Sequence, residues 1–301
     1  MFTDIRQKGW IKALPEKAQP YAYLMRLDRP IGNWLLFWPG AFAIVLAAEF
    51  PEMVDTALTT LLLFAIGAPV MRAAGCTIND LWDRELDKGV ERTAGRPIAA
   101  GDITPKQALY LLGGLLFLGL IILMQLPLTA VLLGFAALPL VILYPLMKRY
   151  TFWPQAFLGL TFNFAVLIGW AAIDITLPME AFLLFLAGLF WTMGYDTIYA
   201  FQDIEDDLTI GVKSTAILFQ DNPKPVIWIF YGAFAVLLGL VQVLSSGSAA
   251  APLSLIPAIW YGGSLIYNWN PDSQINSLET FKANRWVGLL VFAGCVITAL
   301  I

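Results

Sequence analysis

Nine apolar stretches, each of about 18 to 22 residues, set the strongest constraint on how this chain can fold, because an α-helix of that length crosses a bilayer core of roughly 30 Å. They lie at 31–48, 56–78, 107–126, 127–147, 152–173, 181–201, 225–245, 251–270 and 284–301. Hydrophobic residues make up 59% of the 301-residue chain and charged residues 13%, a composition outside the soluble globular range. The sequence therefore predicts an all-α, polytopic membrane protein with nine transmembrane helices.

Basic residues are distributed unevenly among the connections. Six of the 18 Lys and Arg residues precede the first predicted span, and five lie between the second and third. Pairs follow the fourth, sixth and eighth spans, whereas the intervening connections contain no Lys or Arg. By the positive-inside rule the N-terminus is cytoplasmic and Ile301 is periplasmic. Because no transit or cleavable signal pattern is present, the expected location is a bacterial inner membrane.

A weak internal similarity relates the segment after the second span to the segment after the sixth. Asn79 and Asp83 correspond to Asp203 and Asp207, and "GVERTA" further on is matched by "GVKSTA" at 211–216. Both segments follow even-numbered spans, so both face the cytoplasm and the repeat is parallel rather than inverted.

This similarity predicts one integral-membrane domain over 1–301 with an internal repeat. Two bundles of about four helices each would surround a central cavity, with a ninth helix added. The expected parts are an interfacial arm at 1–30, pseudo-repeats at about 31–147 and 152–270, and the ninth helix at about 284–301.

Acidic residues follow both of these spans at matching intervals. Asn79, Asp83 and Asp87 are spaced by four, so they share one face if the second span continues as a helix, and Asp203 and Asp207 have the same spacing. Carboxylates at this density repel one another unless cations neutralise them. Acids at a membrane boundary are often only solvated charges, but two matched clusters on one side of the membrane favour a cation site. Oxygen ligands in a chain without His point to Mg²⁺.

Arg72 and Asp196 are charged residues that lie inside the predicted spans and away from the span ends, where a charge is costly. Each precedes its acidic cluster by seven residues, which predicts a place two helical turns deeper on the same face. They could neutralise each other as an intramembrane ion pair. Alternatively, Arg72 holds an anionic part of a substrate while Asp196 orients a neighbouring donor.

Two segments, "GCTINDLWDRELDKGVERTAGRP" (75–97) and "YDTIYAFQDIEDD" with "GVKSTA" (195–216), resemble the paired Asp-rich motifs NDxxDxxxD and DxxxD of the UbiA-type intramembrane prenyltransferases. Two further segments, "LMRLDRPIGNWLLFWP" (24–39) and "YPLMKRYTFWPQAFLGLTFNF" (144–164), make the chain most similar to the members that act on 4-hydroxybenzoate in ubiquinone biosynthesis. The resemblance spans nearly the whole chain.

The resemblance implies a nine-span helical fold with a central cavity and Mg²⁺ as the cofactor. Two Mg²⁺ ions would be held between the motifs by Asn79, Asp83, Asp87, Asp203 and Asp207. Asp83 and Asp207 are thereby expected to be essential for catalysis. The implied reaction is transfer of a polyprenyl group from polyprenyl diphosphate to the ring of 4-hydroxybenzoate through an allylic cation.

The resemblance also suggests substrate contacts. Arg92, Arg96 and Lys213 are candidates for the diphosphate, and Arg72 or Arg149 for the carboxylate of the aromatic acid or for a phosphate. Tyr195, Tyr199 and Asp196, which lie together on the sixth span, are further candidates. The partners expected are these two substrates and membrane lipid, with no nucleic acid, while the oligomeric state and the prenyl length stay open.

Two alternatives to this function remain. The same chemistry could act on another acceptor, such as a naphthoate, haem, chlorophyllide or a glyceryl phosphate. A secondary transporter also combines parallel repeats with buried charges, but its binding site would lie near the bilayer midplane rather than at the cytoplasmic boundary.

Overall fold

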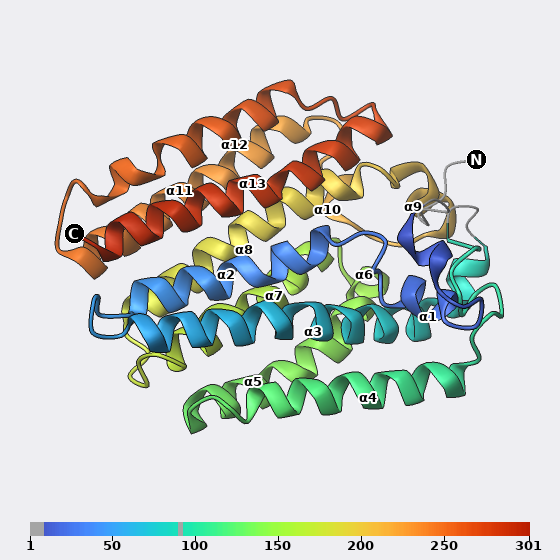
Figure 1. Cartoon of the computed structure of the whole chain (residues 1–301). Helices are drawn as coiled ribbons and strands as arrows, with labels where there is room; N and C mark the ends of the chain where they lie inside the picture. The colour runs from blue at the N-terminus through green and yellow to red at the C-terminus, as the bar shows by residue number, and fades with distance from the viewer. Residues whose placement is uncertain (1–8, 90–92) are drawn as a thin grey trace. The chain divides into compact units, whose positions relative to one another are not determined.

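The computed structural model describes residues 9–89 and 93–301, and these residues form helices without any strand (Figure 1). The α-helices are α1 (Gln19–Leu24), α2 (Ile31–Ala47), α3 (Val54–Lys88), α4 (Pro105–Leu123), α5 (Leu128–Leu143), α6 (Met147–Tyr150), α7 (Pro154–Ala171), α8 (Met179–Ala200), α9 (Ile204–Ile210), α10 (Thr215–Leu218), α11 (Pro223–Ser246), α12 (Ile256–Asn268) and α13 (Gln274–Ala299). Short 3₁₀ helices are η1 (Trp10–Ala13), η2 (Tyr144–Leu146) and η3 (Ala251–Leu255). The predicted all-α class is confirmed.

Within the described ranges, seven helices are long and apolar enough to cross a membrane. They are α3, α4, the run from α5 through α6, α7, α8, α11 and α13. The other two predicted spans coincide with shorter helices, because α2 has 17 residues and α12 has 13. At about 1.5 Å per residue, α2 covers about 25 Å, less than a full hydrocarbon core. The polytopic membrane class is confirmed, whereas the number nine is not.

Two helices extend well beyond the apolar stretches that predicted them. The second span was expected to end at 78, but α3 continues to Lys88 and carries the first acidic cluster on it. The ninth was expected to begin at 284, but α13 begins at Gln274, where the Ser273 hydroxyl accepts a hydrogen bond from the Asn276 N–H. An uncharged stretch of sequence ends at the first polar turn. The helix itself continues beyond that turn as long as one of its faces is packed.

The chain divides into two compact units. Unit 1 comprises residues 1–33 and 66–122, and unit 2 comprises residues 34–65 and 123–301.

In unit 1, the C-terminal half of α3 packs against α4 through small residues. Ala73 and Ala74 are buried against Leu115 of α4. The segment before α4 ends in a capping box, in which the Thr104 hydroxyl accepts from the Gln107 N–H and the Gln107 side chain accepts from the Thr104 N–H. Thr104 therefore caps this helix.

A second cluster in unit 1 joins the N-terminal arm to the segment between α3 and α4. Leu24, at the end of α1, packs with Ile98, Ile103 and Ala108, and Leu81 of α3 lies beside them. The arm and the 93–104 segment are thereby fixed against the part of α3 that carries the acids.

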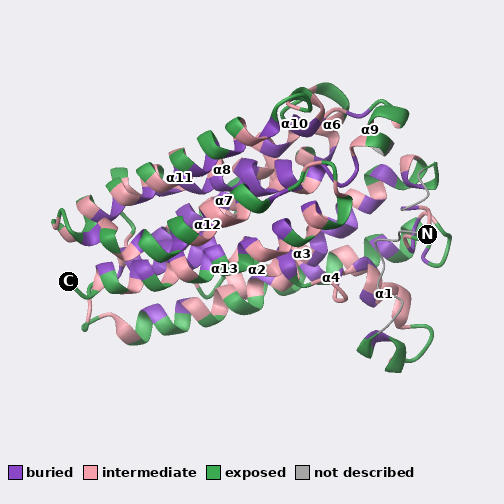
Figure 2. Ribbon diagram, turned by 90° about the horizontal axis from the view of Figure 1, so that it is seen from above, coloured by how far each residue is buried: buried purple, intermediate pink, exposed green. Residues whose placement is uncertain are grey.

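In unit 2, α8 is the central helix, packed against α7 and α11. In the apolar part of α8, 61% of the residues are buried, whereas only 11% are buried in the apolar part of α4. Figure 2 colours the helices by this burial. The buried Asn284 side chain joins three helices, because its Oδ1 accepts from Trp191 Nε1 (3.0 Å) and from the Tyr231 hydroxyl (2.6 Å). Satisfied buried polar groups of this kind hold a bundle where helices cannot gain from excluding water.

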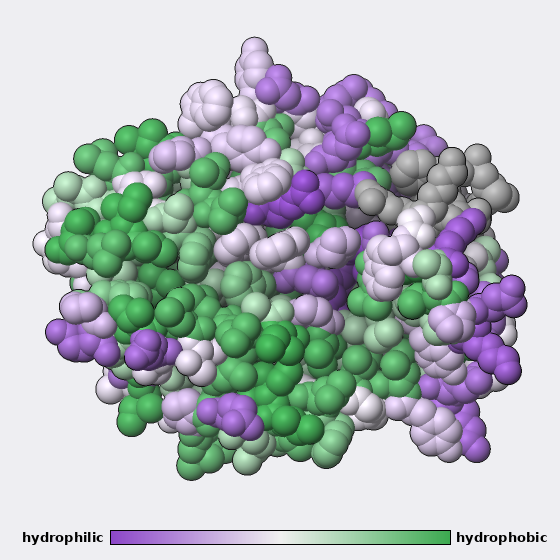
Figure 3. Space-filling model, in the orientation of Figure 1, coloured by the Kyte–Doolittle hydropathy of each residue, from purple (hydrophilic) through white to green (hydrophobic). Residues whose placement is uncertain are grey.

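Large hydrophobic side chains point outward from the spans. Examples are Phe117 of α4, Leu132 of α5 and Val236 of α11, each more than half exposed. In Figure 3 hydrophobic residues cover much of the visible face. This pattern is unfavourable in water and expected in lipid.

Candidate active site

The first acidic motif, Asn79, Asp83 and Asp87, lies on one face of α3. Because α3 is continuous to Lys88, the spacing by four places the three residues one above another, as predicted. Asp83 is fully buried and Asp87 is 6% exposed. Arg72 lies on the same helix two turns before Asn79, as its spacing predicted, while its depth in the membrane stays a prediction.

Asp87 is engaged by the segment that follows α3. Arg96 Nη1 lies 3.1 Å and 3.0 Å from the two carboxylate oxygens of Asp87, and the Thr93 hydroxyl donates to the Asp87 carbonyl (3.0 Å). Arg96 was predicted to contact a diphosphate, and the structure places it at the motif. Arg92 lies outside the described residues.

Asp80 was missed as a partner in this cluster. It is fully buried, and its Oδ1 accepts from Arg26 Nη2 (2.6 Å) and lies 3.4 Å from Arg96 Nη1. In the sequence, Arg26 is one of the six basic residues before the first predicted span, which indicate only the topology. The signal available in the sequence was the motif NDxxDxxxD itself, since its first Asp, directly after Asn79, is Asp80, which lies seven residues before Asp87 on the same helical stripe.

The second acidic motif, Asp203 and Asp207, is built differently from the first. Helix α8 ends at Ala200, the chain turns, and Asp203 immediately precedes α9, which contains Asp207. The Asp207 N–H donates to the Asp203 carbonyl (2.8 Å), so the first turn of α9 sets their spacing. The prediction that Asp196 shares a continuous helical face with Asp203 is therefore wrong, because the helix does not continue between them.

The "GVKSTA" segment packs directly against the second motif. Gly211 has φ +73°, and its N–H and that of Val212 (3.1 Å) both donate to the Asp207 carbonyl. A left-handed residue at this point ends α9, which favours glycine. In each motif, therefore, the carbonyl of the last acid accepts a bond from the following matched segment, although the donor at Asp87 is the Thr93 hydroxyl rather than a backbone N–H.

Lys213 lies beside the segment that connects α5 to α7. Its N–H donates to the Lys148 carbonyl (2.8 Å), and its Nζ donates to the Tyr150 carbonyl (3.1 Å). Arg149, an exposed residue of α6, lies between these two carbonyls in the chain. Two predicted substrate residues, Lys213 and Arg149, are thus brought into one neighbourhood.

The aromatic candidates on α8 are part of the packing. Tyr195 is 1% exposed, its hydroxyl donates to Thr192 (3.2 Å), and its ring meets Trp191 edge to face. The Tyr199 ring centroid lies 4.6 Å from that of Phe281 on α13. Both tyrosines therefore have packing partners, and their predicted contact with substrate stays a prediction.

Arg72 is partly buried in unit 1. Its Nη1 donates to the Cys76 sulfur one turn further along α3, and its guanidinium lies against Gly32 of α2 so closely that a Cβ there would overlap it. The absence of a side chain at Gly32 thus makes room for the guanidinium.

Within 9–89 and 93–301, and leaving aside the Asp206 side chain, which the structure does not describe, no group of three His, Cys, Asp or Glu side chains is placed to hold a metal ion. Mg²⁺ does not need such a cage, because it commonly binds through one or two carboxylates, retained waters and substrate phosphates. The first motif fits that chemistry, since it offers an amide and two carboxylates on one helical face. The positively charged guanidinium of Arg96 already lies against one of these carboxylates, Asp87.

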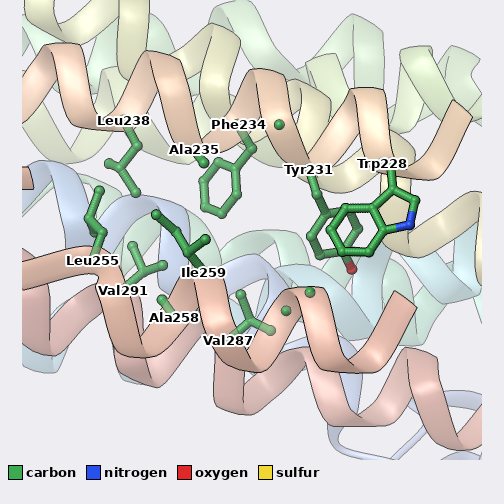
Figure 4. Close-up of a pocket in the computed structure, with 13 residues that line it drawn as sticks. Trp228, Tyr231, Phe234, Ala235, Leu238, Leu255, Ala258, Ile259, Val287 and Val291 are labelled. Atoms are coloured by element: carbon green, nitrogen blue, oxygen red, sulfur yellow. The ribbon is translucent and has the colours of Figure 1, made fainter. Parts of the chain in front are cut away.

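An apolar pocket of about 100 Å³ lies in unit 2 between α11, α12 and α13 (Figure 4). Trp228 and Tyr231 line one end of it, and Leu238, Leu255 and Val291 line the other. All its lining residues are uncharged, so it contains neither acidic motif.

Two relatives of similar sequence bear the same name. The chain is 45% identical to the mitochondrial 4-hydroxybenzoate polyprenyltransferase of Drosophila melanogaster over 301 residues, covering 99% of this chain and 76% of that protein. It is 46% identical to the mitochondrial 4-hydroxybenzoate polyprenyltransferase of Homo sapiens, covering 95% of this chain and 77% of the relative.

Solved structures with the same fold include two archaeal proteins. A UbiA homolog from Aeropyrum pernix K1 matches with a TM-score of 0.69 at 22% identity, over 89% of this chain and 98% of that one. A UbiA homolog from Archaeoglobus fulgidus, bound to GPP and Mg²⁺, matches with a TM-score of 0.67 at 18% identity, over 94% and 100%. Residues 36–288 match the model of the UbiA prenyltransferase family. From this match and the identity with its relatives along the chain, the protein belongs to the UbiA prenyltransferase family.

Proposed function

We propose that this protein transfers a polyprenyl group from polyprenyl diphosphate to the ring of 4-hydroxybenzoate. The observation that carries the proposal is an identity of about 45% along almost the whole chain with relatives that bear this activity in their names. A likeness confined to the fold would leave the acceptor open, since one fold hosts different substrates.

Both acidic motifs have the ligand chemistry for Mg²⁺. The residues that would hold it are Asn79, Asp83, Asp87, Asp203 and Asp207. When bound, Mg²⁺ supplies positive charge that neutralises a diphosphate and so makes it a better leaving group. The Archaeoglobus homolog, whose structure contains GPP and Mg²⁺, supports use of this ion.

Basic side chains complete the binding of the donor. Arg96, Lys213 and Arg92 would donate charge-assisted hydrogen bonds to the diphosphate oxygens. As the allylic C–O bond breaks, its electron pair stays on the diphosphate, and the developing charge is stabilised by these donors. The apolar surroundings exclude water from the allylic cation.

The acceptor would be held by its carboxylate. Arg72, partly buried and in contact with Cys76 and Gly32, is the proposed partner, and Arg149 is the second candidate for the same role. The ring carbon beside the hydroxyl forms the new C–C bond, and the released diphosphate then takes up the proton of that carbon, which restores the aromatic ring. Asp196, with Tyr195 and Tyr199 beside it on α8, would orient the reactants rather than act as a strong base.

The proposed location is a bacterial inner membrane, with a cytoplasmic N-terminus and a site open to the cytoplasm. The relatives compared above are mitochondrial by name. Labelling of a cysteine introduced at Lys17, from one side of sealed vesicles and then the other, tests the orientation, and reaction from the periplasmic side would refute it.

The test of the function is transfer of a radiolabelled polyprenyl group to 4-hydroxybenzoate by purified protein in liposomes, with Mg²⁺ or with EDTA. Prenylated 4-hydroxybenzoate formed only with Mg²⁺ supports the proposal. Diphosphate release without this product means that another acceptor is used, and naphthoate, haem and glyceryl phosphate are then tried in turn. No diphosphate release under any condition refutes prenyl transfer and reopens transport.

Two substitutions test the motifs separately. Asp83→Asn and Asp207→Asn are each expected to abolish turnover, because each removes a ligand charge. Glu85→Gln is the matched control, since Glu85 lies on the same helix with 69% of its side chain exposed. Near-normal turnover in either Asn variant, with folding intact, would remove that motif from the metal site.

A further inference from the structure

A buried chain of alternating charges runs through unit 1. Arg26 Nη2 bonds Asp80 Oδ1 at 2.6 Å, Asp80 Oδ1 lies 3.4 Å from Arg96 Nη1, and Arg96 Nη1 bonds both oxygens of Asp87. The four side chains are each 11% exposed or less. Two arginines and two carboxylates thus lie against one another in a place where an unpaired charge is costly.

Arg26 is held in a conformation that its own segment does not favour. It follows α1 with φ +57°, a value rare for a residue other than glycine. Its N–H donates to the Tyr23 carbonyl (3.0 Å) and its Nη1 to the same carbonyl (3.3 Å), so the chain doubles back onto α1. The ion pair with Asp80, a residue of α3, stabilises this unfavourable turn.

Arg96 has two carboxylate neighbours rather than one. Asp87 is a proposed Mg²⁺ ligand, and a carboxylate that binds a metal has less charge to share with an arginine. Asp80 points to the same guanidinium and has no proposed metal role. Arg96 would therefore keep one anion beside it while Asp87 serves the metal.

We propose that Asp80 is a positioning residue, which tethers Arg26 of the arm and Arg96 of the 93–104 segment to α3 so that Arg96 stays at the motif when the donor diphosphate arrives. The inference rests on the proposed function for the role of the diphosphate, whereas the tether itself is a property of the free protein. Asp80 does not touch the reacting atoms.

The tether is tested on the protein without metal or substrate. Asp80→Asn keeps the size of the side chain and removes its charge, so hydrogen exchange is expected to become faster in residues 19–29 and 93–104 and to stay unchanged in α11. Glu85→Gln, on the same helix and exposed, is expected to leave exchange as in the parent. Unchanged exchange in both segments of Asp80→Asn overturns the proposal, whatever the activity.

The role in the reaction is tested by steady-state kinetics. Asp80→Asn is expected to raise the KM for polyprenyl diphosphate by about tenfold and to leave the KM for the aromatic acid within about twofold. Combined with Arg96→Gln, it is expected to add little to the effect of Arg96→Gln alone, since both changes remove the same donor. Multiplying effects, or a KM change confined to the aromatic acid, overturns the proposal.

Arg26→Gln provides an independent arm if Asp80→Asn fails to fold. It removes only the arm from the tether, so faster exchange is expected in 19–29 while 93–104 stays protected by Asp80 and Asp87. Loss of protection throughout unit 1 would overturn the proposal, because it would indicate a general loss of folding. If the parent protein transfers no prenyl group, the proposed function fails, while the exchange results still decide the tether.

Discussion

Gly32→Ala is expected to weaken binding of the aromatic acid without unfolding the protein. Gly32 lies in the first turn of α2 with no left-handed φ, so alanine suits the backbone and is the better helix former. The atoms that a new Cβ would overlap are Nε, Cζ and Nη2 of Arg72, the far end of a flexible side chain. The guanidinium should therefore move, and the helix should not.

The size of the effect follows from the bond that Arg72 is proposed to make. A hydrogen bond to a charged group contributes about 1.5–3 kcal/mol, and about 1.4 kcal/mol corresponds to a factor of ten. Arg72→Ala is thus expected to raise the KM for 4-hydroxybenzoate by roughly 10- to 100-fold. Gly32→Ala is expected to give the lower part of that range, because the displaced guanidinium keeps its charge nearby.

The assay is initial-rate kinetics in liposomes with each substrate varied in turn. Gly75→Ala is the matched control, since Gly75 lies one turn from Arg72 on α3 and a Cβ there would meet no atom within 4 Å. The double variant of Gly32 and Arg72 should behave like Arg72→Ala alone. A KM for the acid that is unchanged in Gly32→Ala but raised in Arg72→Ala would refute the contact, and a raised KM for the diphosphate would assign Arg72 to the donor.

Three further changes test the packing and the caps. Asn284→Leu leaves a buried indole N–H and a phenol hydroxyl without their acceptor, so the free energy of unfolding is expected to fall by about 2–4 kcal/mol. The protein should then unfold at a lower SDS concentration, and an unchanged unfolding midpoint would refute the network. Thr104→Ala removes the cap of α4 and should lower the free energy of unfolding by about 1 kcal/mol in the same SDS titration. Amide hydrogen exchange should become faster only at that end of the helix. The Thr176 hydroxyl bonds Asp174 and lowers the pKa of that carboxyl, so its stabilisation is present at neutral pH and lost as the pH falls through the lowered pKa. Thr176→Val should therefore lower the free energy of unfolding at pH 7 by less than about 1 kcal/mol, because Asp174 is partly exposed to solvent. The effect should be seen as a slightly lower melting temperature at pH 7 and should vanish below that pKa.

Most of the fold was predictable because membrane spans are specified by length and apolarity. The limits were set by packing, since α2 and α12 are shorter than their apolar stretches and α13 begins well before its own. No local pattern reports how much of an apolar stretch is helical.

The site was predictable where one helix carries it. Asn79, Asp83 and Asp87 stack as their spacing requires, because α3 continues through them. The second motif breaks that rule, since α8 ends at Ala200 although the interval of residues is the same. The pairing of Arg26 with Asp80 joins residues far apart in the chain, so no periodicity could indicate it.

The deep burial of α8 bears on how the protein enters its membrane. Asn163 of α7 donates to Thr192 of α8 (3.0 Å), and its side chain lies where a Cβ at Gly188 would be, so the two backbones approach closely. Such polar and small residues weaken the affinity of each segment for lipid on its own. We expect α7 and α8 to leave the translocon as a hairpin, each masking the polar groups of the other, whereas α4, which faces lipid along most of its length, can partition alone.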